Sequence, residues 1–193
     1  MTAGIEVFAE RGYANTTIRA ILARAGLRDR YFGESFPNTA ALLIAIHDEL
    51  DDAMLDKVCK AMDPAAPPVT RYRQMISTLV EGFQNQPDAT KVKLVEISAA
   101  GPLAESHRQR GLDRYADLVA DMLPSDGSIT DIRTRVLAKA VVVGGNSMFL
   151  DWTRNPQSRM SPTELIEHAV LLFEGVVSAL DLRAELPSPR QRE

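Results

Sequence analysis

The segment FAERGYANTTIRAILARAGL, residues 8–27, contains the end of one helix and the whole of a short second one. Gly12 predicts the end of a first helix that runs from about Thr2 to Arg11, because glycine readily adopts the backbone conformation that ends helices. The hydroxyl of Thr17 is a suitable cap for the second helix, Ile18 to Ala25, and another glycine follows it. The segment therefore predicts two helices joined by a tight connection.

A further short helix follows within two residues and covers about 28–35. Pro37 cannot continue it, and a long helix is then expected from Thr39 to Met62. Two short helices between a preceding and a following helix form the helix-turn-helix arrangement, in which the second short helix enters the major groove of DNA. We expect its apolar side chains to pack together in a small core: Ile5, Phe8, Ile18, Ile21, Ala25, Leu27, Phe32 and Phe36.

Apolar residues recur at helical spacing through the rest of the chain, and no segment alternates as a strand does. The sequence predicts an all-α protein of about nine helices, the later ones near residues 69–85, 88–99, 103–123, 130–153 and 162–184. We expect a DNA-binding domain at residues 1–47 with its motif at about 17–36, an effector-binding and dimerisation domain at 48–185, and a flexible tail at 186–193.

Composition allows this interpretation without proving it. The net charge of the chain is −4, yet residues 1–47 contain five arginines against four carboxylates. Arginine is the side chain best shaped for bidentate contacts with phosphate and guanine. A single cysteine excludes an internal disulfide, and no apolar run is long enough to span a bilayer. We therefore expect a cytoplasmic protein without a membrane segment.

The motif residues resemble a known family. Phe8 to Arg19, then Ala25-Gly-Leu, Tyr31-Phe, and Phe36-Pro-Asn-Thr-Ala-Ala-Leu-Leu look like the N-terminal domain of TetR-type (TetR/AcrR) transcriptional regulators, over about residues 3–50. The resemblance implies that Thr17 caps its helix beside a phosphate and that residues 28–34 enter the groove. The expected DNA-contacting residues are Thr17, Arg19, Arg28, Arg30, Tyr31 and Thr39.

The sequence departs from the family pattern at several positions. Leu22 stands where alanine is usual, Gly33 where a tyrosine is common, and Thr39 where a lysine is common. The first helix is also short at its start. These departures predict fewer phosphate contacts and a shallower dependence of DNA affinity on salt, because each neutralised phosphate adds about 0.9 to the logarithmic slope.

Large apolar side chains of the later helices are candidates for the lining of an effector cavity. A small-molecule site is expected to be mostly apolar with a few polar anchors, and Asn146, Ser147 and Asp151 lie close enough in sequence to supply them. Most such side chains belong to an ordinary core. The candidate lining residues are Tyr72, Met75, Phe83, Tyr115, Met148, Phe149 and Trp152.

The last two helices contain more apolar surface than one protomer is expected to cover, which predicts a four-helix homodimer interface. Gly144-Gly145 fits either a close helix contact at that interface or a ligand pressed against the backbone. The apolar residues expected to be available are Val141, Val142, Val143, Met148, Leu165, Ala169, Leu172, Phe173, Val176 and Leu180.

Enzymatic motifs are absent from the sequence. His47, His107 and His168 lie on three expected helices without the spacing of metal ligands, and no glycine-rich phosphate loop follows a strand. We expect no cofactor and no metal, and we interpret Asp51-Asp52 as a solvated helix face.

The prediction is thus a ligand-responsive DNA-binding regulator, a homodimeric repressor that a small molecule releases from palindromic operator DNA. In it, an effector changes the spacing of the two recognition helices, with the long helix from Thr39 as the pivot. The alternative is a helical ligand-binding dimer with little or no DNA affinity, which Gly33, Thr39 and the short first helix favour.

Overall fold

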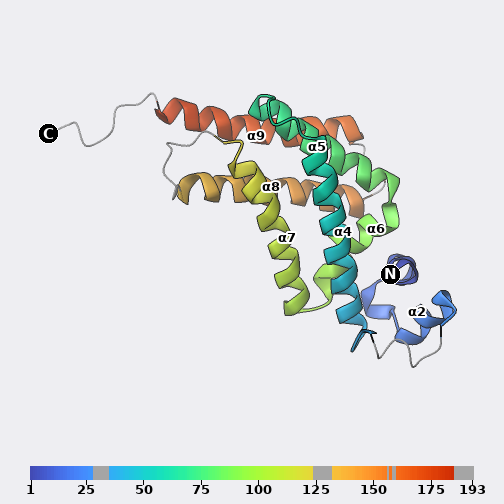
Figure 1. The fold of residues 1–193 in the computed structure, drawn as a ribbon. Helices are drawn as coiled ribbons and strands as arrows, with labels where there is room; N and C mark the ends of the chain where they lie inside the picture. Colours follow the sequence, from blue (N-terminus) through green and yellow to red (C-terminus); the bar gives the residue numbers. More distant parts are fainter. Residues whose placement is uncertain (28–34, 124–131, 156, 158–159, 185–193) are drawn as a thin grey trace.

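The computed structural model describes residues 1–27, 35–123, 132–155, 157 and 160–184. Within these ranges the chain is helical and contains no strand, so the all-α prediction is confirmed. Figure 1 shows α8 and α9 lying across one end of the molecule, and α4 and α7 running from them toward the N-terminal helices.

The N-terminal helices follow the sequence pattern closely. Helix α1 spans Thr2–Arg11, a single 3-10 turn η1 spans Tyr13–Asn15, and α2 spans Ile18–Ala25. Gly12, with φ of 75°, carries the chain out of α1, and the Thr17 hydroxyl accepts the Ala20 N–H at 3.2 Å. The expected helix at 28–35, with Arg28, Arg30, Tyr31 and Gly33, lies outside the described residues except for Ser35.

The remaining helices form the larger part of the molecule. Asn38 caps α4, Thr39–Ala61, by accepting the Ala41 N–H at 2.8 Å. The helices that follow begin at prolines in four cases out of five, as expected of a residue that needs no N–H partner in the first turn. They are α5 Pro68–Asn85, α6 Pro87–Leu94, α7 Pro102–Ala120, α8 Ile132–Arg154 and α9 Pro162–Ala184.

The single helix expected at 88–99 is wrong, because the chain divides there into α6 and the 3-10 turn η2, Glu96–Ala99. The turn directs Glu96 toward the N-terminal helices, where its carboxylate accepts the Tyr13 N–H. A contact to a distant segment therefore prevails over the continuous helical pattern.

Two hydrophobic clusters make up the core. The smaller one joins α1, α2 and the first half of α4 to residues of α6, η2 and α7, among them Val92 and Ile97. The larger one lies between α5, α7, α8, α9 and the end of α4. Helix α4 contributes to both, and the expected boundary between residues 47 and 48 lies inside it.

Fewer apolar residues in and after α2 are buried than expected. Ile21 and Leu22 are buried, whereas Ile18, Ala25 and Leu27 are exposed. Ile18 and Ala25 lie on the same face as the buried pair, one turn before and one turn after it. Leu22, the departure from the family pattern, is thus a core residue.

The set of apolar residues of α8 and α9 expected at a dimer interface is partly wrong. Five of the ten residues expected to be available are buried within the protomer: Val141, Val142, Leu165, Ala169 and Phe173. The large apolar side chains that these helices do expose are Ile132, Val136, Val143 and Leu171. Periodicity identifies an apolar helix, but it does not say which side of that helix faces its own core. No helix among the described residues is long and apolar enough to cross a membrane.

Candidate functional site

A cavity that is partly open to solvent lies within the larger cluster and is lined by residues of five helices. Its free volume is about 60 Å³, where a single ordered water requires roughly 10–15 Å³. The wall is apolar over most of its extent, with a polar end formed by α4, α6 and α7. The lining residues are His47, Asp51, Tyr72, Met75, Ile76, Leu79, Phe83, Lys93, Leu94, Arg108, Leu112, Tyr115, Val142, Gly145, Asn146 and Phe149.

The structure brings together most of the candidate lining residues. Tyr72, Met75, Phe83, Tyr115 and Phe149 all face this cavity, and so does Asn146. Met148 and Trp152 do not line it. The Trp152 Nε1 donates to the Met160 carbonyl at 3.3 Å and its ring borders a separate surface hollow.

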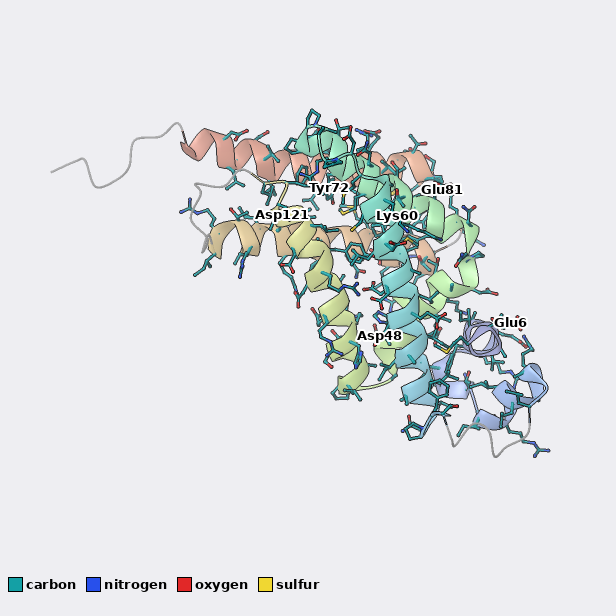
Figure 2. All side chains as sticks on the ribbon, viewed as in Figure 1. Glu6, Asp48, Lys60, Tyr72, Glu81 and Asp121 are labelled. Atoms are coloured by element: carbon teal, nitrogen blue, oxygen red, sulfur yellow. The ribbon has the colours of Figure 1, made fainter. Side chains whose placement is uncertain are left out.

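Aromatic pairs fix the apolar wall. The Tyr72 and Phe173 rings stack with centroids 4.4 Å apart, and Phe83 meets Phe149 edge to face at 5.4 Å. Figure 2 labels Tyr72 on α5, where it lies among α5, α8 and α9. Burial raises the pKa of the Tyr72 hydroxyl, so this group stays neutral. The wall is therefore rigid and uncharged.

The polar end is organised around Asp51, which is only 3% exposed. The expectation that Asp51-Asp52 forms a solvated face is wrong for Asp51, although Asp52 is exposed. The Lys93 ammonium donates to Oδ1 of Asp51, and Nη1 of Arg114 lies 3.5 Å from Oδ2. Burial of this carboxylate is tolerated because two cations face it.

His47 lies one helical turn before Asp51 and is also buried. Its pKa is lowered, first because burial disfavours the imidazolium and then because Lys93 is nearby, while a contact with Asp48 opposes the shift. The same Asp48 holds His107 of α7, with 2.7 Å between Oδ2 and Nδ1. Figure 2 labels Asp48 on the side of α4 that faces α7.

Two further groups complete the polar end. Arg108 of α7 forms a bidentate pair with Glu105, at 2.9 and 2.7 Å, and lowers the pKa of that carboxyl to about 2. The Tyr115 Oη is buried and finds no hydrogen-bond partner among the described residues. The Lys93 Nζ lies 5.8 Å from the centroid of the Tyr115 ring.

Sequence reasoning missed His47, Asp51, Lys93 and Arg108 as lining residues. A signal for two of them was present, because His47 and Asp51 continue the i, i+4 series that begins at Leu43 on the buried face of α4. Polar residues in such a series mark a site that packs against polar partners. Lys93 and Arg108 carried no comparable signal, since both lie on helices with many exposed charges.

Helix α6 lies between this cavity and the N-terminal helices. Lys93 and Leu94 line the cavity, while the preceding residues face the other way. Lys91 Nζ donates to the Ala9 carbonyl at 2.6 Å, and Val92 is buried in the smaller cluster. Glu96 accepts the Tyr13 N–H at 2.7 Å. The segment 91–96 therefore contacts both the cavity and the N-terminal helices.

The described part of the candidate DNA-contacting surface is found on α2 and at the start of α4. Thr17 and Arg19 are exposed, and Thr39 is half-buried. Arg24 on α2 pairs with both Glu6 and Glu10 of α1, which links the two helices. No group of three or more His, Cys, Asp or Glu among the described residues is arranged to hold a metal ion.

Comparison with known proteins places these features in context. Residues 1–46 match the family model described as bacterial regulatory proteins, tetR family. No curated protein matches the sequence. The matched segment contains α1, α2 and the beginning of α4, together with the candidate DNA-contacting residues.

Solved structures match nearly the whole chain. The transcriptional regulator FadR from Bacillus subtilis, solved in complex with stearoyl-CoA, is 18% identical with a TM-score of 0.74, over 92% of this chain and 95% of that one. The fatty acid degradation regulator FadR from Bacillus halodurans is 18% identical with a TM-score of 0.75, over 90% of this chain and 95% of that one. A TetR-family transcriptional regulator from Bordetella parapertussis is 20% identical with a TM-score of 0.65, over 97% of this chain and 95% of that one.

At these identities the likeness to solved structures shows the fold alone, and the family model describes residues 1–46. Residues 1–46 thus match the tetR family of bacterial regulatory proteins, and the chain has an all-helical fold similar to that of the solved TetR-family transcriptional regulators.

Proposed function

We propose that this protein is a homodimeric transcriptional repressor that binds a palindromic operator and is released when a small molecule occupies the central cavity. In this proposal residues 1–47 form the DNA-binding domain and residues 48–185 form the effector and dimer domain. The observation that carries it is the position of α6, whose Lys93 and Leu94 line the cavity while Lys91 and Val92 contact the N-terminal helices.

The cavity supports a ligand-responsive function. It is mostly apolar, has a few convergent polar groups, and is lined by helices that also contact the N-terminal domain. A ligand that widens it displaces α4 or α6, and α4 carries the segment at residues 38–46 to which the DNA-binding helices are joined. Such a ligand shifts the protein between two arrangements only if it prefers one of them. Stearoyl-CoA in the Bacillus subtilis structure supports a ligand in this class of fold.

The exposed apolar side chains of α8 and α9 support the homodimer. Ile132 and Leu171 are 74% and 64% exposed in the protomer. Exposed Val136 and Val143 lie four residues and eleven residues after Ile132, so they fall on one face of α8. A pair of such faces related by a two-fold axis forms a four-helix interface and holds two recognition helices at a set distance.

The test is a titration of the dimer on DNA from upstream of its own coding sequence, at several salt concentrations. We expect tight, salt-dependent binding that Arg28→Ala and Arg30→Ala each weaken about tenfold or more, while Arg154→Ala, an exposed arginine on α8, leaves it unchanged. Equal DNA affinity of the three variants would show that residues 28–34 do not contact the DNA. Absence of any DNA binding would favour the alternative of a ligand-binding dimer.

A further inference from the structure

The polar end of the central cavity contains an imbalance of charge. Two cations, Lys93 and Arg108, line the cavity with one carboxylate, that of Asp51. His47 is neutral there because burial lowers its pKa. Since Asp51 is held by Lys93 and by Arg114, Arg108 is the cation whose charge no other lining residue balances.

The present partner of Arg108 is a carboxylate on the solvent side of the helix. This partner, Glu105, lies outside the cavity lining, with 43% of its side chain exposed, whereas the Arg108 side chain is 22% exposed. When Arg108 turns away from it, the Glu105 carboxylate is solvated by water and is not left as a buried charge. A carboxylate inside the cavity would meet a less hydrated guanidinium, and the bidentate geometry would be retained.

A second observation indicates that a polar group is missing from the cavity. The Tyr115 hydroxyl is buried and has no hydrogen-bond partner among the described residues. An unpaired buried hydroxyl is destabilising, and a ligand that accepts a hydrogen bond from it removes that cost. Tyr115 and Arg108 lie on the same helix, two turns apart, and both line the cavity with the amide of Asn146.

We infer that the effector is a slender amphiphile with an apolar body and a carboxylate head, and that the head binds Arg108 and the Tyr115 hydroxyl. The apolar body lies along Leu79, Phe83 and Phe149. Any ligand larger than a few waters must widen a cavity with a free volume of about 60 Å³, and a flexible chain does so with smaller displacements of the walls than a broad ring system. The inference rests on the proposed function for its effect on DNA, whereas ligand binding is measured independently.

Calorimetric titration with decanoate, decanol and decylamine, all below their micelle concentrations, tests the head group. The three probes share one chain and differ in charge. We expect decanoate to bind at least about tenfold more tightly than the other two, because only the carboxylate pairs with Arg108. Equal affinity for the three probes, or no binding of decanoate, would overturn the inference.

Variants of α7 locate the contact. Arg108→Gln should weaken decanoate about tenfold or more and leave decanol unchanged, while Arg110→Gln, an exposed residue of the same helix outside the cavity, should change neither. Glu105→Gln should strengthen decanoate severalfold, because it removes the carboxylate that competes for Arg108, and it keeps the test open if Arg108→Gln does not fold. Decanoate affinity that neither variant alters would contradict the assignment of the head.

The same titrations on the DNA complex separate the two proposals. If decanoate binds as expected but leaves the affinity for upstream DNA unchanged, release by a ligand is wrong and the ligand class stands. If another compound releases the DNA while decanoate does not bind, the ligand class is wrong and the proposed function stands.

Discussion

The Glu96 carboxylate accepts a hydrogen bond from the backbone N–H of Tyr13 at 2.7 Å, across 83 positions of sequence. Glu96 is buried, and a Cβ added at Gly12 would lie 3.4 Å from Oε2 of this carboxylate. A charged acceptor therefore satisfies the first N–H of the turn that follows α1 and joins the N-terminal domain to the segment beside the cavity.

Replacing Glu96 should loosen this junction. We expect Glu96→Ala to lower the free energy of unfolding by about 1–3 kcal/mol, because it removes a charged hydrogen bond and leaves the Tyr13 N–H unpaired. Glu96→Gln, which keeps an acceptor oxygen, should cost less. Urea unfolding measures both, and Glu81→Ala, an exposed carboxylate on α5, serves as the control (Figure 2). Equal stability of the Glu96 and Glu81 variants would show that the bond does not contribute.

The two adjacent glycines of α8 should respond differently to alanine. At Gly145 an added Cβ meets only the Tyr72 hydroxyl, at 3.8 Å, whereas at Gly144 it comes within 3.0 Å of the Leu172 side chain. Gly145→Ala should therefore stabilise the protein by about 0.5–1 kcal/mol through the helix backbone. Gly144→Ala should give a smaller gain in stability, because the Leu172 side chain must move. Urea midpoints compare them, and an equal gain would mean that Leu172 adjusts freely.

A charge on the outer face of α9 should disrupt the proposed dimer. Leu171→Asp places a carboxylate at a position that is 64% exposed in the protomer and central to the proposed interface. We expect the dimer dissociation constant to rise at least about tenfold, as measured by sedimentation equilibrium, because the charge loses its water when the faces meet. Leu103→Asp, on α7 at 65% exposure, is the matched control. A dimer that survives Leu171→Asp must use another surface.

The buried imidazole of His47 should make stability depend on pH. Burial lowers its pKa below the ordinary value of 6.5, so the unfolded chain binds this proton at a higher pH than the folded chain. The favourable contribution of neutral His47 is complete above that value and is lost as the pH falls from 6.5 toward the folded pKa. His47→Gln should reduce this loss. Denaturant unfolding between pH 7.5 and 5 gives the comparison, and parallel curves for the two proteins would contradict it.

Loss of the helix cap on α2 should destabilise the N-terminal helices. Thr17→Ala removes the hydroxyl that accepts the Ala20 N–H, and such caps are worth about 1 kcal/mol. Thr163→Ala changes an exposed threonine on α9 and should cost less. If the hydroxyl also contacts phosphate, Thr17→Ala weakens DNA binding more than its effect on stability explains.

The helices and their ends follow from local chemistry. Gly12 and Thr17 act through their own backbone and the residues next to them, so the sequence alone predicted α1 and α2. The starts of the later helices were predicted within one or two residues. Five of the seven candidate cavity residues were found in the same way, because large apolar side chains on the inner faces of helices must meet. The match to the tetR family model likewise depends on residues adjacent in the chain.

The polar end of the cavity and the division of the 88–99 helix were decided by tertiary structure. Asp51 is buried only because Lys93 and Arg114 reach it from two other helices, and no pattern within α4 contains those partners. Helix α6 ends at Leu94, and Glu96 of the turn that follows accepts the N–H of Tyr13, which is distant in sequence. The sequence by itself thus determined which segments are helices and which family the first domain resembles. Only the folded chain determined which charges are buried, because the stability of a buried charge depends on partners that packing brings to it.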